Sequence, residues 1–228
     1  MPDSLFSDDE LSKLKEITEL YSLTKTLVFY SEEMDHLETF VPSLNEIKDA
    51  QDHLMRVLSV KFGIKEDAPS DYVEINLHKV HSHLYRAAFE LLDYIRIYQY
   101  DEITKQLEDI SNEAIVNAFP SYYSTIKPRI EILFEKIPVY KKEKDIGAPD
   151  LSALKGYFEV INEVKEHIKT IKTMKATLIQ YDLKKKADEI KKRDEEKSSK
   201  RKDYAITFVM LIIAALVGGI VLHYLWPS

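Results

Sequence analysis

The sequence lacks cysteine altogether and is poor in glycine, and both absences narrow the range of folds. Without cysteine there is no disulfide framework and no thiolate metal site, which suits a reducing cytoplasm. Only five glycines occur in 228 residues, so few positions favour the tight turns that join neighbouring strands. No long alternation of polar and apolar residues is present either. The sequence therefore predicts an all-α protein.

A third absence is local, because Asp, Glu, Lys and Arg are missing from Tyr204–Trp226. As a helix this stretch would be about 34 Å long, enough to cross the roughly 30 Å hydrocarbon core of a bilayer. Tyr204 and Trp226 stand where interfacial aromatic belts are found. Gly218 and Gly219 offer a face for close helix approach, although their spacing is not GxxxG. A buried core helix would normally be shorter and carry a polar stripe, so we expect a single transmembrane helix over 204–226, with 227–228 as a short tail.

The charges beside this stretch indicate its orientation. Residues 183–203 contain ten Lys or Arg and six acids, in a chain whose net charge is −7. Basic residues next to a span stay on the cytoplasmic side. The acidic start of the chain, MPDSLFSDDE, resembles no secretory signal. We therefore expect a tail-anchored protein with its N-terminal body in the cytoplasm, in a bacterial inner membrane rather than a eukaryotic organelle.

The same basic run is a candidate lipid-binding segment. Contact with anionic headgroups is predicted for Lys191, Lys192, Arg193, Lys200, Arg201 and Lys202. A solvated helix face held by charge pairs fits the run equally well, and the two interpretations are compatible. The rest of the chain is strongly acidic, so general nucleic-acid binding is not expected, because phosphate neutralisation dominates that affinity.

Apolar residues recur at steps of three and four through residues 1–150, which predicts a helical bundle. Capping-box sequences at Ser7–Glu10 and Ser43–Glu46 predict the starts of the first two helices. Pro42 is expected to end the first helix and Gly63 to cap the second.

The later boundaries of the body are predicted from polar and proline residues. A break near Gln99–Asp101 is expected to separate a long third helix from a fourth over 103–118. The next helix, over about 121–137, has to start late or kink at Pro128. The segment 138–149 is expected to be the longest loop of the body.

The last body helix is predicted to run from Leu151 towards Asp203. Its apolar stripe continues to Tyr181 and thins beyond Leu183, where charged residues take over. We therefore expect 151–203 to complete the bundle and then to form a charged juxtamembrane stalk.

Histidines and charged residues of the third helix are candidates for metal binding or for structural ion pairs. Glu74, His78 and His81 share one helix face and could meet a metal, but partly packed surface histidines are the simpler interpretation. Arg86 with Glu90 or Asp93, and Arg96 further along, are expected to form structural ion pairs between neighbouring helices. No phosphate-binding glycine loop or nucleophile elbow is present. No cofactor is expected.

A sharper pattern lies on the second helix, where Lys48, Asp49 and His53 follow one another within six residues. The pattern resembles the motif of HEPN-family helical domains, in which an arginine, a polar residue and a histidine share one helix. The resemblance implies a bundle that dimerises and a metal-independent endoribonuclease of toxins and antiphage effectors. It implies that His53 is the general acid/base, Asp49 its polar partner and Lys48 the cation. Lysine stands where the family has arginine, and the two differ at a bidentate phosphate site.

Three functions follow from these features. The first is a non-enzymatic, membrane-localised interaction or effector module, whose bundle binds a protein partner or a second copy. The second is a HEPN-like ribonuclease tethered to the membrane, the one case in which nucleic acid would be a partner. The third is a SNARE-like fusion protein, which the charged run 183–203 disfavours because coiled-coil heptads should continue to the membrane.

Overall fold

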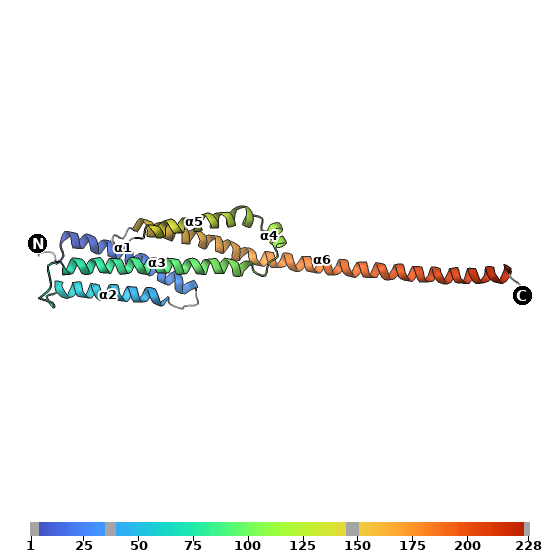
Figure 1. The fold of residues 1–228 in the computed structure, drawn as a ribbon, viewed down its shortest axis with the longest axis horizontal. Helices are drawn as coiled ribbons and strands as arrows, with labels where there is room; N and C mark the ends of the chain where they lie inside the picture. Colours follow the sequence, from blue (N-terminus) through green and yellow to red (C-terminus); the bar gives the residue numbers. More distant parts are fainter. Residues whose placement is uncertain (1–4, 35–39, 145–150, 226–228) are drawn as a thin grey trace. The chain divides into compact units, whose positions relative to one another are not determined.

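The computed structural model describes residues 5–34, 40–144 and 151–225, with side chains described as far as Gly219. These residues form helices and no strand, which confirms the all-α prediction. The helices are α1 (Asp8–Met34), α2 (Val41–Lys61), α3 (Tyr72–Leu107), α4 (Asn112–Ala118), the π-helical turn η1 (Tyr122–Ile126), α5 (Lys127–Lys142) and α6 (Leu151–Leu225) (Figure 1). The chain divides into two compact units. Residues 1–109 with 119–175 form the first, and residues 110–118 with 176–228 form the second.

Helix α3 is the centre of the first unit, because α1 and α2 both pack on it. Its side chains Leu84, Phe89 and Leu91 are buried with apolar residues of four other helices. These partners include Leu20 and Leu27 of α1, Val57 of α2, Leu133 and Ile137 of α5, and Leu154, Ile161 and Val164 of α6. The apolar faces predicted from helical spacing therefore meet in one core.

The start of α1 is the predicted capping box. The Ser7 backbone N–H donates to Glu10 Oε2 at 2.9 Å, and the Glu10 N–H donates to Ser7 Oγ at 3.2 Å. Glu10 also accepts a hydrogen bond from Lys61 of α2 at 2.5 Å. The carboxylate that caps α1 thus also joins it to the end of α2.

The capping box predicted at Ser43–Glu46 is wrong. Helix α2 begins at Val41, three residues before the start that a Ser43 cap implies, with Pro42 in its first turn, a position where a missing N–H costs nothing. Ser43 is buried and its Oγ donates to the Phe40 carbonyl at 2.8 Å. Pro42 therefore lies in the first turn of the second helix instead of ending the first, and residues 35–39, which the first helix was expected to include, lie outside the described residues. At the other end of α2, Gly63 has a φ of +69°, as expected for a capping glycine.

The break predicted near Gln99–Asp101 is also wrong, since α3 continues to Leu107 and the predicted fourth helix is reduced to α4. Gln99 is fully buried, and its Nε2 donates to Tyr30 Oη at 3.0 Å and to the Ile161 carbonyl at 2.9 Å. The polar side chain that suggested a helix end instead joins α1, α3 and α6.

Of the two predictions made from the prolines of α5, one is confirmed and the other is wrong. The late start predicted at Pro128 is confirmed, because η1 precedes α5 and Pro128 occupies its first turn. Pro138 lies inside α5, which continues to Lys142, so the predicted loop over 138–149 is too long. Ile130, Leu133 and Ile137 anchor the buried face of α5, whereas Pro138 is on its exposed side. Packing of that face offsets the lost backbone hydrogen bond.

Helix α6 is the predicted long helix, and it continues without a break as far as Leu225. In the first unit it buries Leu154, Ile161, Val164 and Ile171, which are members of the predicted stripe. In the second unit Leu178 is fully buried, while every side chain described beyond Leu183 is exposed or half-buried. The thinning of the stripe therefore marks the end of packing along α6.

Candidate functional site

A polar cluster lies between α2 and α3 in the first unit, and it contains the histidine singled out by the sequence. The His53 ring stacks on the His83 ring, with 5.3 Å between centroids and 19° between planes. His53 Nδ1 is 2.8 Å from Asn76 Oδ1, and His83 Nδ1 is 2.7 Å from Glu46 Oε2. Arg86 Nη1 donates to both oxygens of Glu46, at 2.9 and 3.2 Å. We call these five residues the histidine seam.

The hydrogen bonds of the histidine seam determine which ring nitrogen of each histidine carries the proton in the neutral state. Asn76 uses its Nδ2 to donate to the Tyr72 carbonyl at 2.7 Å, so its Oδ1 faces His53 as an acceptor. His53 Nδ1 must therefore carry a proton, and His83 Nδ1 must carry one to donate to the Glu46 carboxylate. In the neutral state both Nε2 atoms are left as acceptors. Two oriented imidazoles of this kind can exchange protons with a bound ligand.

Glu46 is the electrostatic centre of the seam. Burial by itself would raise the pKa of Glu46, but the hydrogen bonds from His83 and Arg86 outweigh it and leave that pKa below its usual value. Glu46 is therefore ionised at neutral pH and neutralises the Arg86 guanidinium. The only cation within the seam is thus already paired with a carboxylate.

The other residues of the predicted motif lie outside the seam. Lys48 and Asp49 are exposed on α2, whereas His53 is half-buried. Lys48 precedes His53 by five residues, so the two side chains point about 140° apart around the helix. Arg56, an alternative cation on the same helix, donates to Asp52 at 2.6 Å. Asp49 precedes His53 by four residues and lies about 40° from it around α2, so within a single copy of the chain only Lys48 is turned away from His53.

The metal alternative on α3 finds no support in the part of the chain that the structure describes, where no group of three candidate ligands occurs. Glu74 and His78 are exposed, and His81 is buried on the side of α3 that packs against α1. Neither ring nitrogen of His81 has a hydrogen-bond partner among the described residues. Its position is that of a core residue.

Arg86 and Asp93 both form the interhelical links expected of them, but with other partners. Arg86 pairs with Glu46 of α2 rather than with Glu90 or Asp93. Asp93 accepts hydrogen bonds from Tyr157 Oη of α6 at 2.9 Å and from Lys141 Nζ of α5 at 2.8 Å. Sequence reasoning missed Glu46, Asn76 and His83 as partners of the seam. The only available signal was the repeated order of histidine, leucine, apolar residue and arginine at His53 and His83.

The apolar end of α6 is a candidate membrane span. Among the described residues, α6 alone holds a window long and apolar enough to cross a membrane, with a mean hydropathy of 1.6 and none of it buried. Large side chains such as Phe208, Leu211 and Leu216 are each more than 60% exposed. A Cβ added at Gly218 or Gly219 would meet open space. Trp226 lies outside the described residues.

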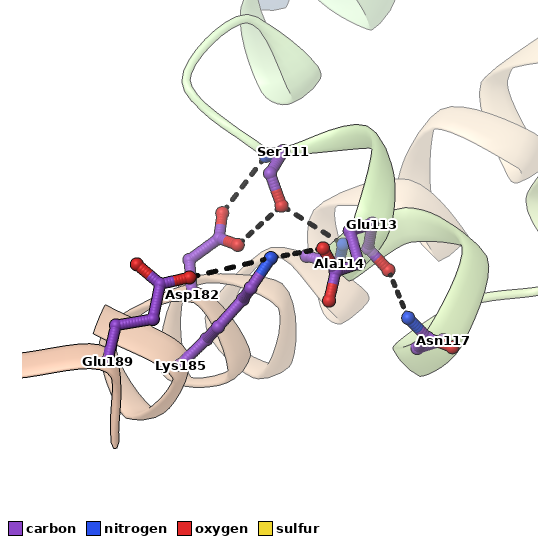
Figure 2. Close-up of polar contacts among 7 residues, drawn as sticks. All are labelled: Ser111, Glu113, Ala114, Asn117, Asp182, Lys185 and Glu189. Carbon is purple, nitrogen blue, oxygen red and sulfur yellow. Dashed lines mark hydrogen bonds and ion pairs between the residues drawn. The ribbon is translucent and has the colours of Figure 1, made fainter. Parts of the chain in front are cut away.

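In the second unit, α4 is held on α6 by a cluster of polar contacts that we call the clasp (Figure 2). The Ser111 N–H donates to Asp182 Oδ2 at 3.0 Å and the Ser111 hydroxyl donates to Asp182 Oδ1 at 2.5 Å. Lys185 pairs with Glu113 of α4 and lies 3.9 Å from Glu189 of α6. The hydrogen bonds from Ser111 hold the pKa of Asp182 below its usual value.

The basic residues predicted to contact lipid lie beyond the clasp. Lys191, Lys192, Arg193, Lys200, Arg201 and Lys202 are all exposed on α6. Lys191 lies 4.0 Å from Glu195, one turn further on. An exposed i,i+4 pair of this kind contributes little and leaves the lysine free to exchange partners.

In comparisons with known proteins, no family model, no curated protein and no solved structure matches the chain.

Proposed function

We propose that this chain is a membrane-anchored helical protein, held in the bilayer by residues 204–226, whose bundle works as an interaction or effector module on the cytoplasmic face. The observation that carries the proposal is the exposure of the apolar end of α6. A water-exposed run of this length would be strongly unfavourable, since apolar burial contributes about 25 cal/mol per Å². A lipid environment removes that cost. The basic residues upstream support the orientation.

The test is membrane extraction of the full chain expressed in bacteria. Alkaline carbonate should leave the chain in the pellet, and detergent should release it. Ile212→Arg together with Leu216→Arg should move it to the soluble fraction, because each central arginine costs about 2.5 to 3.5 kcal/mol on the insertion scale. Ile212→Val with Leu216→Ile is the matched control and should remain in the pellet. Release of the original chain by carbonate would disprove the anchor.

Orientation is tested by labelling, which the absence of native cysteine makes straightforward. Asp67→Cys places a thiol in an exposed loop of the bundle, and Ser228→Cys places one after the span. A membrane-impermeant maleimide added to intact cells should label only the second. Labelling of the first without permeabilisation would reverse the orientation.

The histidine seam favours a second candidate function, a metal-independent ribonuclease of the HEPN-like type. His53 Nε2 would take the proton of a ribose 2′-hydroxyl while O2′ attacks the adjacent phosphorus. The bond to the 5′-oxygen then breaks, and that oxygen takes a proton from His83 in its protonated form. The products are a 2′,3′-cyclic phosphate and a 5′-hydroxyl. The cation would be the exposed Lys48, supplied by a second copy, because Arg86 is bound to Glu46.

This candidate is tested by the integrity of total RNA in cells expressing the full chain. Cleavage of ribosomal or transfer RNA should be lost in His53→Ala and retained in His78→Ala, an exposed histidine outside the seam. Expression levels are matched by immunoblot. Intact RNA with the original chain, or equal cleavage by both variants, would count against the ribonuclease function. The non-enzymatic, membrane-anchored interaction module would then remain as the proposed function.

A further inference from the structure

An apolar stripe is exposed on α6 between the buried part of the helix and the candidate span. Ile179, Leu183 and Ile190 are 41%, 61% and 56% exposed, and Ala187 is exposed between them. At about 100° per residue, the other three side chains all lie within roughly 40° of the direction of Leu183. The stripe ends with Ile190, because Asp194 follows one turn later on the same side.

Basic residues border this stripe on both sides. Lys184 and Lys191 lie about 80° to 100° to one side of Leu183, and Lys186 and Arg193 lie about 60° to 80° to the other. The acids gather behind, since Asp188, Glu189, Glu195 and Glu196 are all more than about 100° away from Leu183. Lys185 and Lys192 share that rear face, so the lipid contact predicted for Lys192 from the basic run alone is not expected in this arrangement. An apolar face bordered by lysine and arginine, with acids behind, complements an anionic lipid surface, because long basic side chains extend towards the headgroups while their stems cover apolar surface.

The clasp occupies a different side of the helix. Asp182 and Lys185, which hold α4, and the buried Leu178 lie about 100° to 160° from Leu183. Figure 2 shows both side chains directed at α4. Helix α4 thus covers the acidic side of α6 and leaves the apolar stripe open.

We propose that residues 179–193 of α6 lie along the cytoplasmic membrane surface, with the apolar stripe against anionic lipid. The proposal rests on the anchor proposed above, which keeps this segment within reach of the bilayer and so compensates for the small size of the stripe. Between the stripe and the span the helix has to bend. Ser198–Ser199 lies in that interval, and paired small polar residues are among the usual sites of helix kinks.

A second copy of the chain complements the apolar stripe less well than an anionic lipid surface does. A shared span would force two copies to be parallel and at the same depth. Pairing through Leu183 and Ile190 would then bring Lys186, Arg193 and Asp194 of one copy beside the same residues of the other. Such like-charge contacts oppose a coiled coil.

The experiment uses full-length single-cysteine variants that carry an environment-sensitive fluorophore. Leu183→Cys and Ile190→Cys probe the stripe, whereas Asp188→Cys and Lys192→Cys probe the rear face and are the matched controls. Each protein is reconstituted into phosphatidylcholine vesicles with or without added phosphatidylglycerol. With the anionic lipid, emission should rise about twofold and be quenched by lipid-borne nitroxide at the two stripe positions only. In vesicles without phosphatidylglycerol, the fluorophore emission at all four positions should be that of a water-exposed probe.

Other outcomes overturn the proposal. Water exposure at all four positions in anionic vesicles would mean that the segment stands away from the membrane. Thiol crosslinking between copies at Leu183→Cys and Ile190→Cys would assign the stripe to a second copy. Flotation of each sample separates these outcomes from failure of the anchor, because a chain that does not float with the vesicles contradicts the proposed function itself.

Discussion

His81 is a buried polar residue in surroundings that offer its ring no hydrogen bond within the described part of the chain. It is 1% exposed, on the side of α3 facing α1, and among the described residues neither ring nitrogen has a hydrogen-bond partner. Burial, helped by the nearby charge of Lys13, lowers its pKa to about 4, although Glu16 opposes the shift. The ring is therefore neutral in the folded protein at pH 7. An unsatisfied polar group of this kind costs about 1 to 3 kcal/mol.

We expect His81→Leu to raise the free energy of unfolding at pH 7 by about 1 kcal/mol or more, because leucine fills a similar volume without unpaired nitrogens. Urea unfolding of the detergent-solubilised chain, followed by circular dichroism, measures this. His78→Leu, at an exposed position on the same helix, should change stability by less than about 0.5 kcal/mol. Destabilisation by His81→Leu would mean that the imidazole makes a favourable contact in the native protein.

His81 also predicts a pH dependence. Its folded pKa lies below the unfolded value of about 6.5, so the unfolded chain binds the proton more readily. Above pH 6.5 this difference in proton binding costs the folded state nothing, and as the pH falls from 6.5 towards about 4 it lowers the free energy of unfolding by roughly 3 kcal/mol at most. The loss should be absent in His81→Leu. An equal loss in that variant would assign the acid sensitivity to other groups.

At the scale of elements, α4 is the helix that depends most on side-chain contacts. It has seven residues, too few to be stable alone, and the clasp supplies the hydrogen bonds that join it to α6. Ser111 also caps α4, since its Oγ accepts from the Ala114 N–H at 3.0 Å. The stability of α4 is therefore coupled to Asp182.

We expect Asp182→Ala to loosen α4 while the first unit stays folded. Amide hydrogen exchange in residues 112–118 should become roughly tenfold faster, because two hydrogen bonds to a carboxylate are lost. Asp188→Ala on the rear face of α6 is the control and should leave that exchange unchanged. Unchanged exchange in Asp182→Ala would show that apolar contacts alone hold α4.

At the scale of the whole molecule, the first unit carries its own hydrophobic core, built from α1, α2, α3, α5 and the first part of α6. None of the described side chains of the candidate span is buried. The fold of the first unit should therefore not require the span.

A chain ending at Asp203 should accordingly be soluble without detergent and unfold in one cooperative transition. Its midpoint in a thermal melt should lie within about 3 °C of that of the full chain in mild detergent, a shift that corresponds to about 1 kcal/mol for a chain of this length. A non-cooperative melt, or loss of near-ultraviolet circular dichroism, would show that the span contributes to folding.

The spacing of apolar residues was enough to predict an all-α chain, the buried faces and the apolar end of α6, because helical periodicity and hydrophobicity are local properties. The helix boundaries were predicted less well, because ends were expected near Gln99, Pro42 and Pro138 and all three residues lie within helices. In each case a local signal for a break was overridden, at Gln99 by buried hydrogen bonds, at Pro138 by packing of the opposite face, and at Pro42 by its tolerated place in a first turn.

The candidate sites, like the helices, were predicted from the sequence only where the signal is local along the chain. By itself, the sequence determined where a candidate membrane span and its basic flank lie, since length, apolarity and charge are read along the chain. It singled out His53 but none of its partners. Only the tertiary structure decided that His53 meets Asn76 and His83, that Glu46 pairs with Arg86, and that α4 covers one side of α6. Such contacts join residues that are 23 to 71 positions apart, and only packing of the helices brings them together.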